Sequence, residues 1–78
     1  MRTVYILKCN DESYYTGFTS DLTGRLNRHN SGQVKYTSSR LPVNTVVLVN
    51  FGNKFKAFDF EGYLKSGSGR AFMNKRLI

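Results

Sequence analysis

Apolar stretches separated by polar residues open the chain, and together they predict a β-hairpin. The first stretch, Thr3–Lys8, is rich in residues that favour strands. The polar run Asn10–Ser13 has the composition of a turn, and Tyr14–Thr16 then resumes the strand pattern before Gly17 ends it. Two strands joined by a short polar turn form a hairpin, which needs another element to cover it.

The strongest strand pattern is Val43–Phe51, in which four apolar residues follow one another from Val46 to Val49. An uninterrupted apolar run of this kind is typical of a strand that is covered on both faces. The segment before it, Gln33–Pro42, is polar and basic, and it predicts an exposed loop.

Helical periodicity marks three further segments. Leu22–Asn30 predicts one helix, and Lys54–Lys65 predicts a second. Ser66–Gly69 predicts a turn between helices, and Arg70–Arg76 then predicts a short last helix. The expected element order is therefore β-β-α-β-α-α, in a single α+β domain covering residues 1–78.

Charge narrows the range of partners. Twelve Lys and Arg against five Asp and Glu give a net charge of +7, which favours a nucleic-acid partner over an anionic membrane. We find no apolar stretch long enough to span a membrane and no secretory signal. Cys9, the only cysteine, fits a small packing residue and a reducing compartment. We therefore expect a cytoplasmic protein.

The first predicted helix carries polar residues on the side that should face the sheet. Successive helical residues are about 100° apart, so Arg25 and His29 fall on the same side as Leu22 and Leu26. In a purely structural role, Arg25 would extend to solvent and His29 would favour the negative end of the helix dipole. The presence of both on one arc favours a functional site.

The second predicted helix has a carboxylate, Glu61, near the middle of its apolar arc. That arc consists of Phe55, Ala57, Phe58, Phe60 and Leu64. A buried carboxylate is costly unless it is paired or holds a cation. One interpretation is a buried salt bridge between Glu61 and Arg25. The other is a metal site, because Mg²⁺ is often held by one carboxylate when phosphate supplies further oxygens.

The hairpin tyrosines, Tyr5 and Tyr15, also have two interpretations. They either pack as strand aromatics beneath a helix or act on a phosphate. A phenol donates to phosphate, and it acts as a base when a nearby cation lowers its pKa. Arg25, His29 or a metal at Glu61 would supply that charge.

The spacing of these residues resembles that of the GIY-YIG nuclease family. The tripeptides Val4-Tyr5-Ile6 and Tyr15-Thr16-Gly17 correspond to the two that name the family, with valine for the first glycine and threonine for the second isoleucine. The segments Tyr36–Pro42 and Leu64–Gly67 further resemble small stand-alone bacterial members, similar to the N-terminal domain of UvrC.

Four later residues extend the resemblance over essentially the whole chain. Arg25 matches the family's catalytic arginine, and His29 matches a position that holds tyrosine or histidine. Glu61 matches the metal-binding glutamate, and Asn74 matches a polar residue near the end of the domain. Phe18 stands where some members carry a lysine that would lower a tyrosine pKa, and His29 is the natural substitute.

The resemblance implies an α+β fold with a small three-stranded antiparallel sheet flanked by helices. It also implies an endonuclease that hydrolyses DNA phosphodiester bonds with a single Mg²⁺ or Mn²⁺ ion at Glu61. The sequence leaves open whether such a nuclease acts in repair or recombination, is a remnant of a mobile element, or is part of a complex. One rival is a nucleic-acid-binding module of the same fold without turnover. Another is a structural protein in which Arg25 and Glu61 form a salt bridge.

The resemblance assigns each residue a role. Arg25 would bind phosphate oxygens, and Tyr5 or His29 would take the proton from water. Tyr15 would hydrogen-bond the phosphate or water network, and Asn74 would orient local structure. We expect contacts with the DNA backbone, without sequence readout, from a set of exposed basic and aromatic residues: Lys35, Tyr36, Arg40, Arg70, Lys75 and Arg76.

Overall fold

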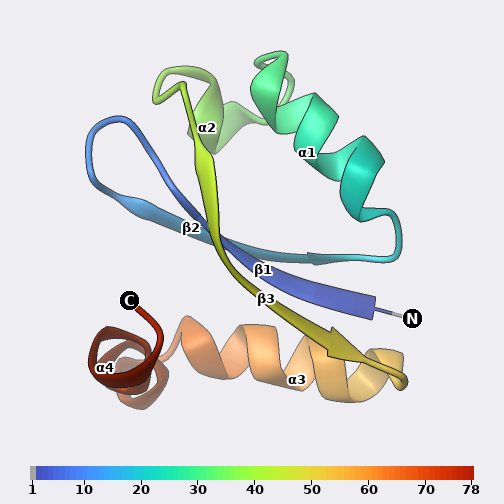
Figure 1. Cartoon of the computed structure of the whole chain (residues 1–78). Coiled ribbons are helices and arrows are strands. Elements are labelled where there is room, and N and C mark those ends of the chain that lie inside the picture. Colours follow the sequence, from blue (N-terminus) through green and yellow to red (C-terminus); the bar gives the residue numbers. More distant parts are fainter. Residues whose placement is uncertain (1) are drawn as a thin grey trace.

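The structure is a computed structural model, and it describes residues 2–78. Its elements are β1 (Arg2–Lys8), β2 (Tyr14–Thr19), α1 (Leu22–Asn30), α2 (Lys35–Ser38), β3 (Asn44–Phe51), α3 (Lys54–Leu64) and α4 (Gly67–Arg76) (Figure 1). The strands form a three-stranded antiparallel sheet in the order β2-β1-β3. This confirms the predicted α+β fold, with the one-turn helix α2 added to the expected order.

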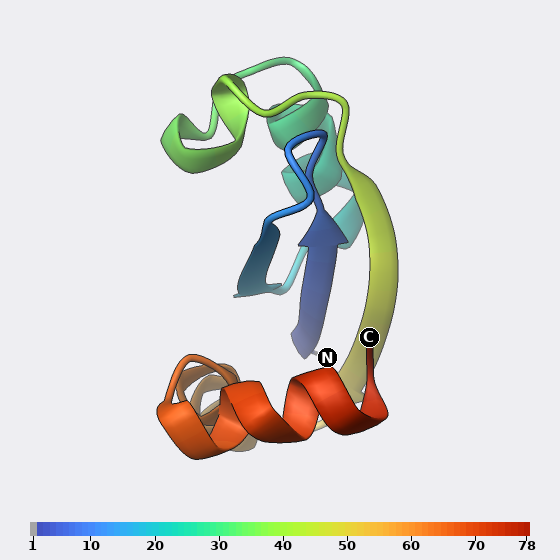
Figure 2. The same cartoon turned by 90° about the vertical axis from the view of Figure 1, so that its left-hand side faces the viewer.

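The central strand β1 divides the molecule into two layers, because successive strand residues point to opposite faces. Val4 and Ile6 face the apolar core, whose other buried members are Ala57, Leu64 and Met73 of α3 and α4. Tyr5 faces the other way, towards α1. Figures 1 and 2 show the resulting arrangement, with α1 and α2 on one side of the strands and α3 and α4 on the other.

β3 is covered on one face, so the prediction of a strand buried on both faces is wrong. It forms an edge of the sheet and pairs with β1 alone. Val47 and Val49 are partly buried, whereas Val46 and Leu48 are 43% and 49% exposed. An apolar run identifies a strand, but whether a second layer covers that strand depends on the rest of the fold.

The apolar arc of α3 is narrower than its sequence predicts. Ala57 and Leu64 are buried, and Phe60 packs against the core. Phe55 and Phe58 are 68% and 59% exposed instead of buried. They lie on the N-terminal half of the helix, outside the strip that is buried in the core.

The segment Gln33–Pro42 is not simply the exposed loop that its composition predicts. Residues Lys35–Ser38 form the single helical turn α2, and Thr37 has no exposed surface. One helical turn is too short to show a periodic apolar pattern in the sequence. The burial of Thr37 depends instead on a tertiary contact.

Cys9, predicted to be a small packing residue, is buried. None of the helices formed by residues 2–78 has the length and apolarity needed to cross a bilayer.

The last helix begins three residues earlier than predicted, because Ser66–Gly69 is its N-terminus and not a separate turn. The Ser66 side chain caps α4 by accepting a hydrogen bond from the Gly69 amide at 3.1 Å. Gly69 is buried where α4 meets the end of α3, and a Cβ there would overlap the Tyr63 carbonyl. This glycine permits the close helix contact.

We expect Gly69→Ala to lower the free energy of unfolding by about 1–3 kcal/mol, because the added methyl group forces the two helices apart. Gly67→Ala is the matched control in the same helical turn, where a Cβ meets no atom within 4 Å. It should leave stability unchanged or raise it by up to about 1 kcal/mol. Urea unfolding of both variants measures the difference, and equal stabilities would contradict the close contact.

Candidate active site

The hydroxyl of Tyr5 lies at the centre of a buried polar cluster built by β1 and α1. Its oxygen is 3.0 Å from Nε2 of His29 and accepts a hydrogen bond from Nε of Arg25, also at 3.0 Å. Tyr5 and His29 have no exposed surface. Arg25 and His29 are one helical turn apart, so both reach the same hydroxyl. Their predicted position on the sheet-facing side of α1 is confirmed.

β2 closes the cluster with Gly17 and Tyr15, two positions that lie on the same face of the sheet as Tyr5. Gly17 pairs directly with Tyr5, and a Cβ at this position would lie 2.6 Å from the Tyr5 hydroxyl oxygen. Any other residue would therefore displace that hydroxyl. The Tyr15 hydroxyl accepts a longer hydrogen bond, 3.4 Å, from Nη2 of Arg25. The Tyr15 and His29 rings meet edge to face, with centroids 4.9 Å apart.

Thr37 completes the cluster, and our sequence analysis missed it. Its Oγ1 lies 2.8 Å from Nδ1 of His29 and also donates to the Val34 carbonyl at 3.4 Å. Because the guanidinium of Arg25 can only donate to the Tyr5 oxygen, Nε2 of His29 is the acceptor left for the hydroxyl proton of Tyr5, and we infer that the ring proton is on Nδ1 and is donated to Oγ1. Nε2 of His29 is then the unprotonated nitrogen. No local pattern marks Thr37, because only the second ring nitrogen of a buried histidine requires it.

The environment keeps both partners neutral near pH 7. Burial raises the pKa of Tyr5 above its ordinary value, opposed by the hydrogen bond from Arg25. Burial also lowers the pKa of His29, as do the positive charges of Arg25 and Arg28. A neutral phenol thus donates to a neutral imidazole, which is the arrangement in which a proton passes from the hydroxyl to Nε2.

Glu61 lies on α3 at the border of the core, with 15% of its side chain exposed. Its partner is Lys65, whose Nζ is 3.2 Å from the carboxylate. Arg25 instead donates to the two tyrosine hydroxyls, so the alternative of an Arg25–Glu61 salt bridge is wrong. The negative charge of Glu61 is near enough to the Tyr5 hydroxyl to raise its pKa slightly.

The donor set around Glu61 fits one mode of metal binding. Within residues 2–78, no three His, Cys, Asp or Glu side chains come together as a metal-binding group. The described residues therefore contain no site built from three or more of these side chains. One partly exposed carboxylate fits a Mg²⁺ or Mn²⁺ ion whose other ligands are water and phosphate oxygens, since these hard cations prefer oxygen.

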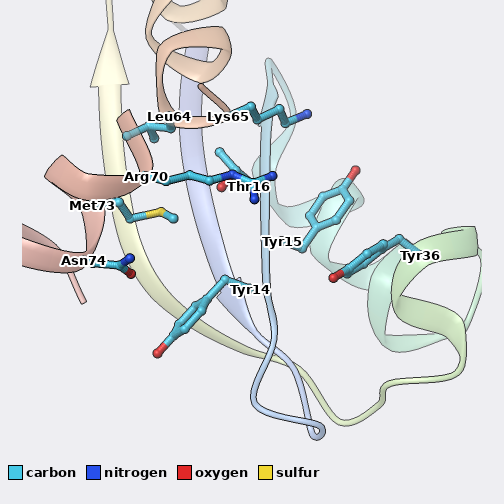
Figure 3. Close-up of a pocket in the computed structure, with 9 residues that line it drawn as sticks. All are labelled: Tyr14, Tyr15, Thr16, Tyr36, Leu64, Lys65, Arg70, Met73 and Asn74. Atoms are coloured by element: carbon cyan, nitrogen blue, oxygen red, sulfur yellow. The ribbon is translucent and has the colours of Figure 1, made fainter. Parts of the chain in front are cut away.

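A cleft of about 540 Å³ opens beside Tyr15. Figure 3 shows Tyr15 and Tyr36 on one side of β2, with Arg70 and Asn74 of α4 on the other. These four predicted residues therefore line one hollow, together with Lys65, which the sequence did not single out. The other predicted basic residues, Lys35, Lys75 and Arg76, are exposed but lie outside the lining of this cleft.

Arg40 has a structural task that its sequence context did not reveal. Its guanidinium lies 4.1 Å from the centroid of the Tyr36 ring and donates to the Tyr36 carbonyl at 2.6 Å. It also donates to Asp11 at 2.9 Å, so it ties α2 to the hairpin turn. The Tyr36 ring, held in this way, lies 5.6 Å from that of Tyr15. The contact of Arg40 with DNA stays a prediction.

The sequence model of the GIY-YIG catalytic domain matches residues 1–76. The chain is 48% identical over 62 residues to a UPF0213 protein of Lactococcus lactis subsp. cremoris, covering 78% of this chain and 63% of that protein. A UPF0213 protein of Clostridium perfringens is 50% identical over 66 residues, covering 83% of this chain and 71% of that protein. The chain thus spans less than two thirds of the length of the Lactococcus relative.

A solved structure supports the same relationship. The chain is similar to the solution NMR structure of a UPF0213 protein from Bacillus halodurans, with 37% sequence identity and a TM-score of 0.61. The match covers 96% of this chain and 84% of that one. The similarity therefore extends over the sheet and the helices on both of its sides.

We expect Thr37→Val to disturb the tautomer of His29, because valine keeps the shape of threonine but leaves the Nδ1 proton without an acceptor. Nitrogen-15 NMR of the imidazole should show Nδ1–H in the native protein and a mixture of tautomers in the variant. Thr37→Val should also cost about 1–3 kcal/mol of stability. Thr37→Ser, which restores the hydroxyl, is the control. The same tautomer in all three proteins would contradict the assignment.

We also expect stability to fall as the pH decreases from about 7.5 to about 5.5. The pKa of folded His29 lies below its ordinary value, so the unfolded chain binds the proton first and acid favours unfolding. His29 is the only histidine. Hydrogen bonds from Ser13 lower the pKa of Asp11, so Asp11 affects stability only at more acidic pH. Urea unfolding across this range tests the slope, which His29→Gln should largely abolish. A flat native profile would contradict a buried neutral imidazole.

Proposed function

Because the chain belongs to the GIY-YIG catalytic-domain family, we propose that it is an endonuclease that hydrolyses DNA phosphodiester bonds with one divalent metal ion. The observation that carries the proposal is the Tyr5 hydroxyl, which lies between Nε2 of His29 and the guanidinium of Arg25, each 3.0 Å away. One hydrogen-bond partner would satisfy a buried structural tyrosine, whereas here a proton acceptor and a fixed positive charge meet at one hydroxyl. The imidazole is placed to take the proton of the phenol.

The proton moves along the cluster in one direction. Tyr5 gives its proton to Nε2 of His29 as its oxygen takes a proton from the attacking water. The hydroxide attacks phosphorus, the bond from phosphorus to the 3′ oxygen breaks, and the leaving oxygen takes a proton from solvent water. His29 becomes an imidazolium, whose Nδ1–H remains bonded to Thr37.

Arg25 controls access to this base. Both hydrogen-bonding positions of the Tyr5 hydroxyl are filled, one by His29 and the other by Arg25, and the residue has no exposed surface. A water molecule reaches the oxygen only by replacing the Arg25 contact. When Arg25 turns its donors to a phosphate, it vacates that position. The base is therefore uncovered when substrate is bound.

Glu61 is the residue that would hold the metal. A Mg²⁺ or Mn²⁺ ion there would neutralise charge on the phosphate and favour departure of the 3′ oxygen. The present partner of the carboxylate, Lys65, is 52% exposed and can move into solvent or onto the DNA backbone. Lys65 lines the cleft with Tyr15, so the metal ligand and the phosphate contacts border one surface.

DNA is the expected substrate because a net charge of +7 and a cleft lined by Arg70, Lys65 and three tyrosines favour a polyanion. Among the described helices we find no recognition helix that would read base edges in a DNA groove. DNA shape would then decide where the strand is cut, as suits repair or recombination. Asn74, in the wall of the cleft, would position the strand.

We expect cleavage of plasmid and branched DNA that requires Mg²⁺ or Mn²⁺ and is lost on chelation. Arg25→Ala and Glu61→Gln should each lower the rate by about 100-fold or more, since each removes charge stabilisation at the phosphate. Arg28→Ala and Asp59→Asn are matched controls, because both side chains are exposed on the same two helices. They should retain activity.

Each of the other outcomes would indicate a different function for this protein. DNA binding without cleavage in any divalent metal would favour a binding module of the same fold. Cleavage that survives Arg25→Ala or Glu61→Gln would place the reaction elsewhere. No binding, with large losses of stability in both variants, would leave the cluster a structural role.

A further inference from the structure

A second hollow lies outside the candidate active site, beside the N-terminal half of α3. It has a volume of about 350 Å³ and is lined by Phe18 of β2, Phe55 and Phe58 of α3, and two cations, Arg2 and Lys54. We call these five residues the aromatic pocket. None of them belongs to the Tyr5 cluster.

The aromatic pocket exposes large apolar rings that a small soluble protein would be expected to bury. Phe55 and Phe58 are the most exposed large apolar residues among those described, at 68% and 59%. Phe58 is held edge to face against Phe18, with centroids 5.8 Å apart, and Lys54 Nζ lies 5.3 Å from the centre of the Phe55 ring. The rings thus form a partly fixed platform beside positive charge.

The pocket is aligned with the proposed metal ligand. In a helix with about 100° per residue, Lys54, Phe58, Glu61 and Lys65 fall within about 60° of one another, along one side of α3. At about 1.5 Å per residue, Phe58 lies about 4.5 Å from Glu61 along the helix axis, and Lys54 about 10 Å. This distance is on the order of one or two nucleotides of an extended strand.

We propose that the aromatic pocket binds an unpaired base of the DNA strand that is cut at Glu61. Bases stack on aromatic rings whatever their sequence, and cations beside such rings hold the adjoining phosphate. A paired base is already stacked within its duplex, so only an unpaired one fits. The preferred substrates are therefore DNAs with unpaired nucleotides near the cut, such as flaps, branches and frayed ends. This inference rests on the proposed nuclease function.

Charge favours DNA over a second copy of the chain as the occupant. Both charged residues of the pocket are cations, and the whole chain carries +7. Two copies meeting at this face would bring four like charges together, whereas a nucleotide brings the opposite charge. A base with its phosphate matches both the rings and the cations.

The chain contains no tryptophan, so a single introduced tryptophan reports on this surface. Phe55→Trp should be quenched when a short oligothymidine is added in EDTA, because a base then stacks on the indole. Phe72→Trp is the control, since Phe72 is an exposed aromatic of α4 outside the pocket. No quenching at position 55, or equal quenching at both positions, would overturn the proposal.

Affinity provides the second measurement. Phe55→Ala should weaken binding to single-stranded or flapped DNA by about 10-fold, the loss expected from one stacked base, and leave binding to blunt duplex unchanged. Phe72→Ala should change neither. Equal losses for both kinds of DNA would overturn the proposal. So would sedimentation that shows a native dimer which Phe55→Ala dissociates.

These experiments test base binding by the aromatic pocket independently of the nuclease proposal, because binding in EDTA does not depend on cleavage. Quenching at position 55 without cleavage in any metal would contradict the nuclease and leave base binding established. Metal-dependent cleavage without quenching would contradict the pocket alone.

Discussion

The burial of the Tyr5 hydroxyl is the constraint on which the polar half of this structure depends. A phenol, an imidazole and a threonine hydroxyl are tolerated together out of water only when each polar atom has a partner. Within residues 2–78 no buried side-chain nitrogen or oxygen lacks one. Meeting this condition requires β1, α1 and α2 at once, because Tyr5, His29 and Thr37 each come from a different element. The same condition excludes a side chain at Gly17.

The two faces of the sheet have different roles, one in the apolar core and the other in the polar cluster. One face of β1 packs into an apolar core with α3 and α4, where the removal of apolar surface from water favours folding. The other face carries the polar cluster, whose hydrogen bonds set geometry more than they add stability. Glu61 lies at the border between the layers, so the charge of a residue of the core helix raises the pKa of Tyr5 on the opposite face.

Features with a local period were predictable from the sequence, and features set by distant neighbours were not. Strand and helix patterns placed the hairpin, β3, α1 and α3, and the four-residue spacing of Arg25 and His29 put both on the side of Tyr5. Thr37 was missed because its burial depends on its hydrogen bond with His29, which no local sequence pattern reveals. The exposure of Phe55 and of one face of β3 was missed because periodicity does not show how many layers the chain can build. Lys65 was overlooked because a lysine at a helix end is ordinarily solvated.

The open edge of β3 has a consequence for how copies of this protein behave together. Asn44–Phe51 contains no charged residue, and an uncharged edge strand is a template for pairing with another sheet. The positive charge of the chain opposes such encounters, over about 30 Å in 0.01 M salt but only about 10 Å in 0.1 M. Colloidal stability thus depends on ionic strength. Copies crowded along one polyanion would lose this mutual repulsion, so the charge that we propose recruits the protein to DNA would no longer keep its edges apart there.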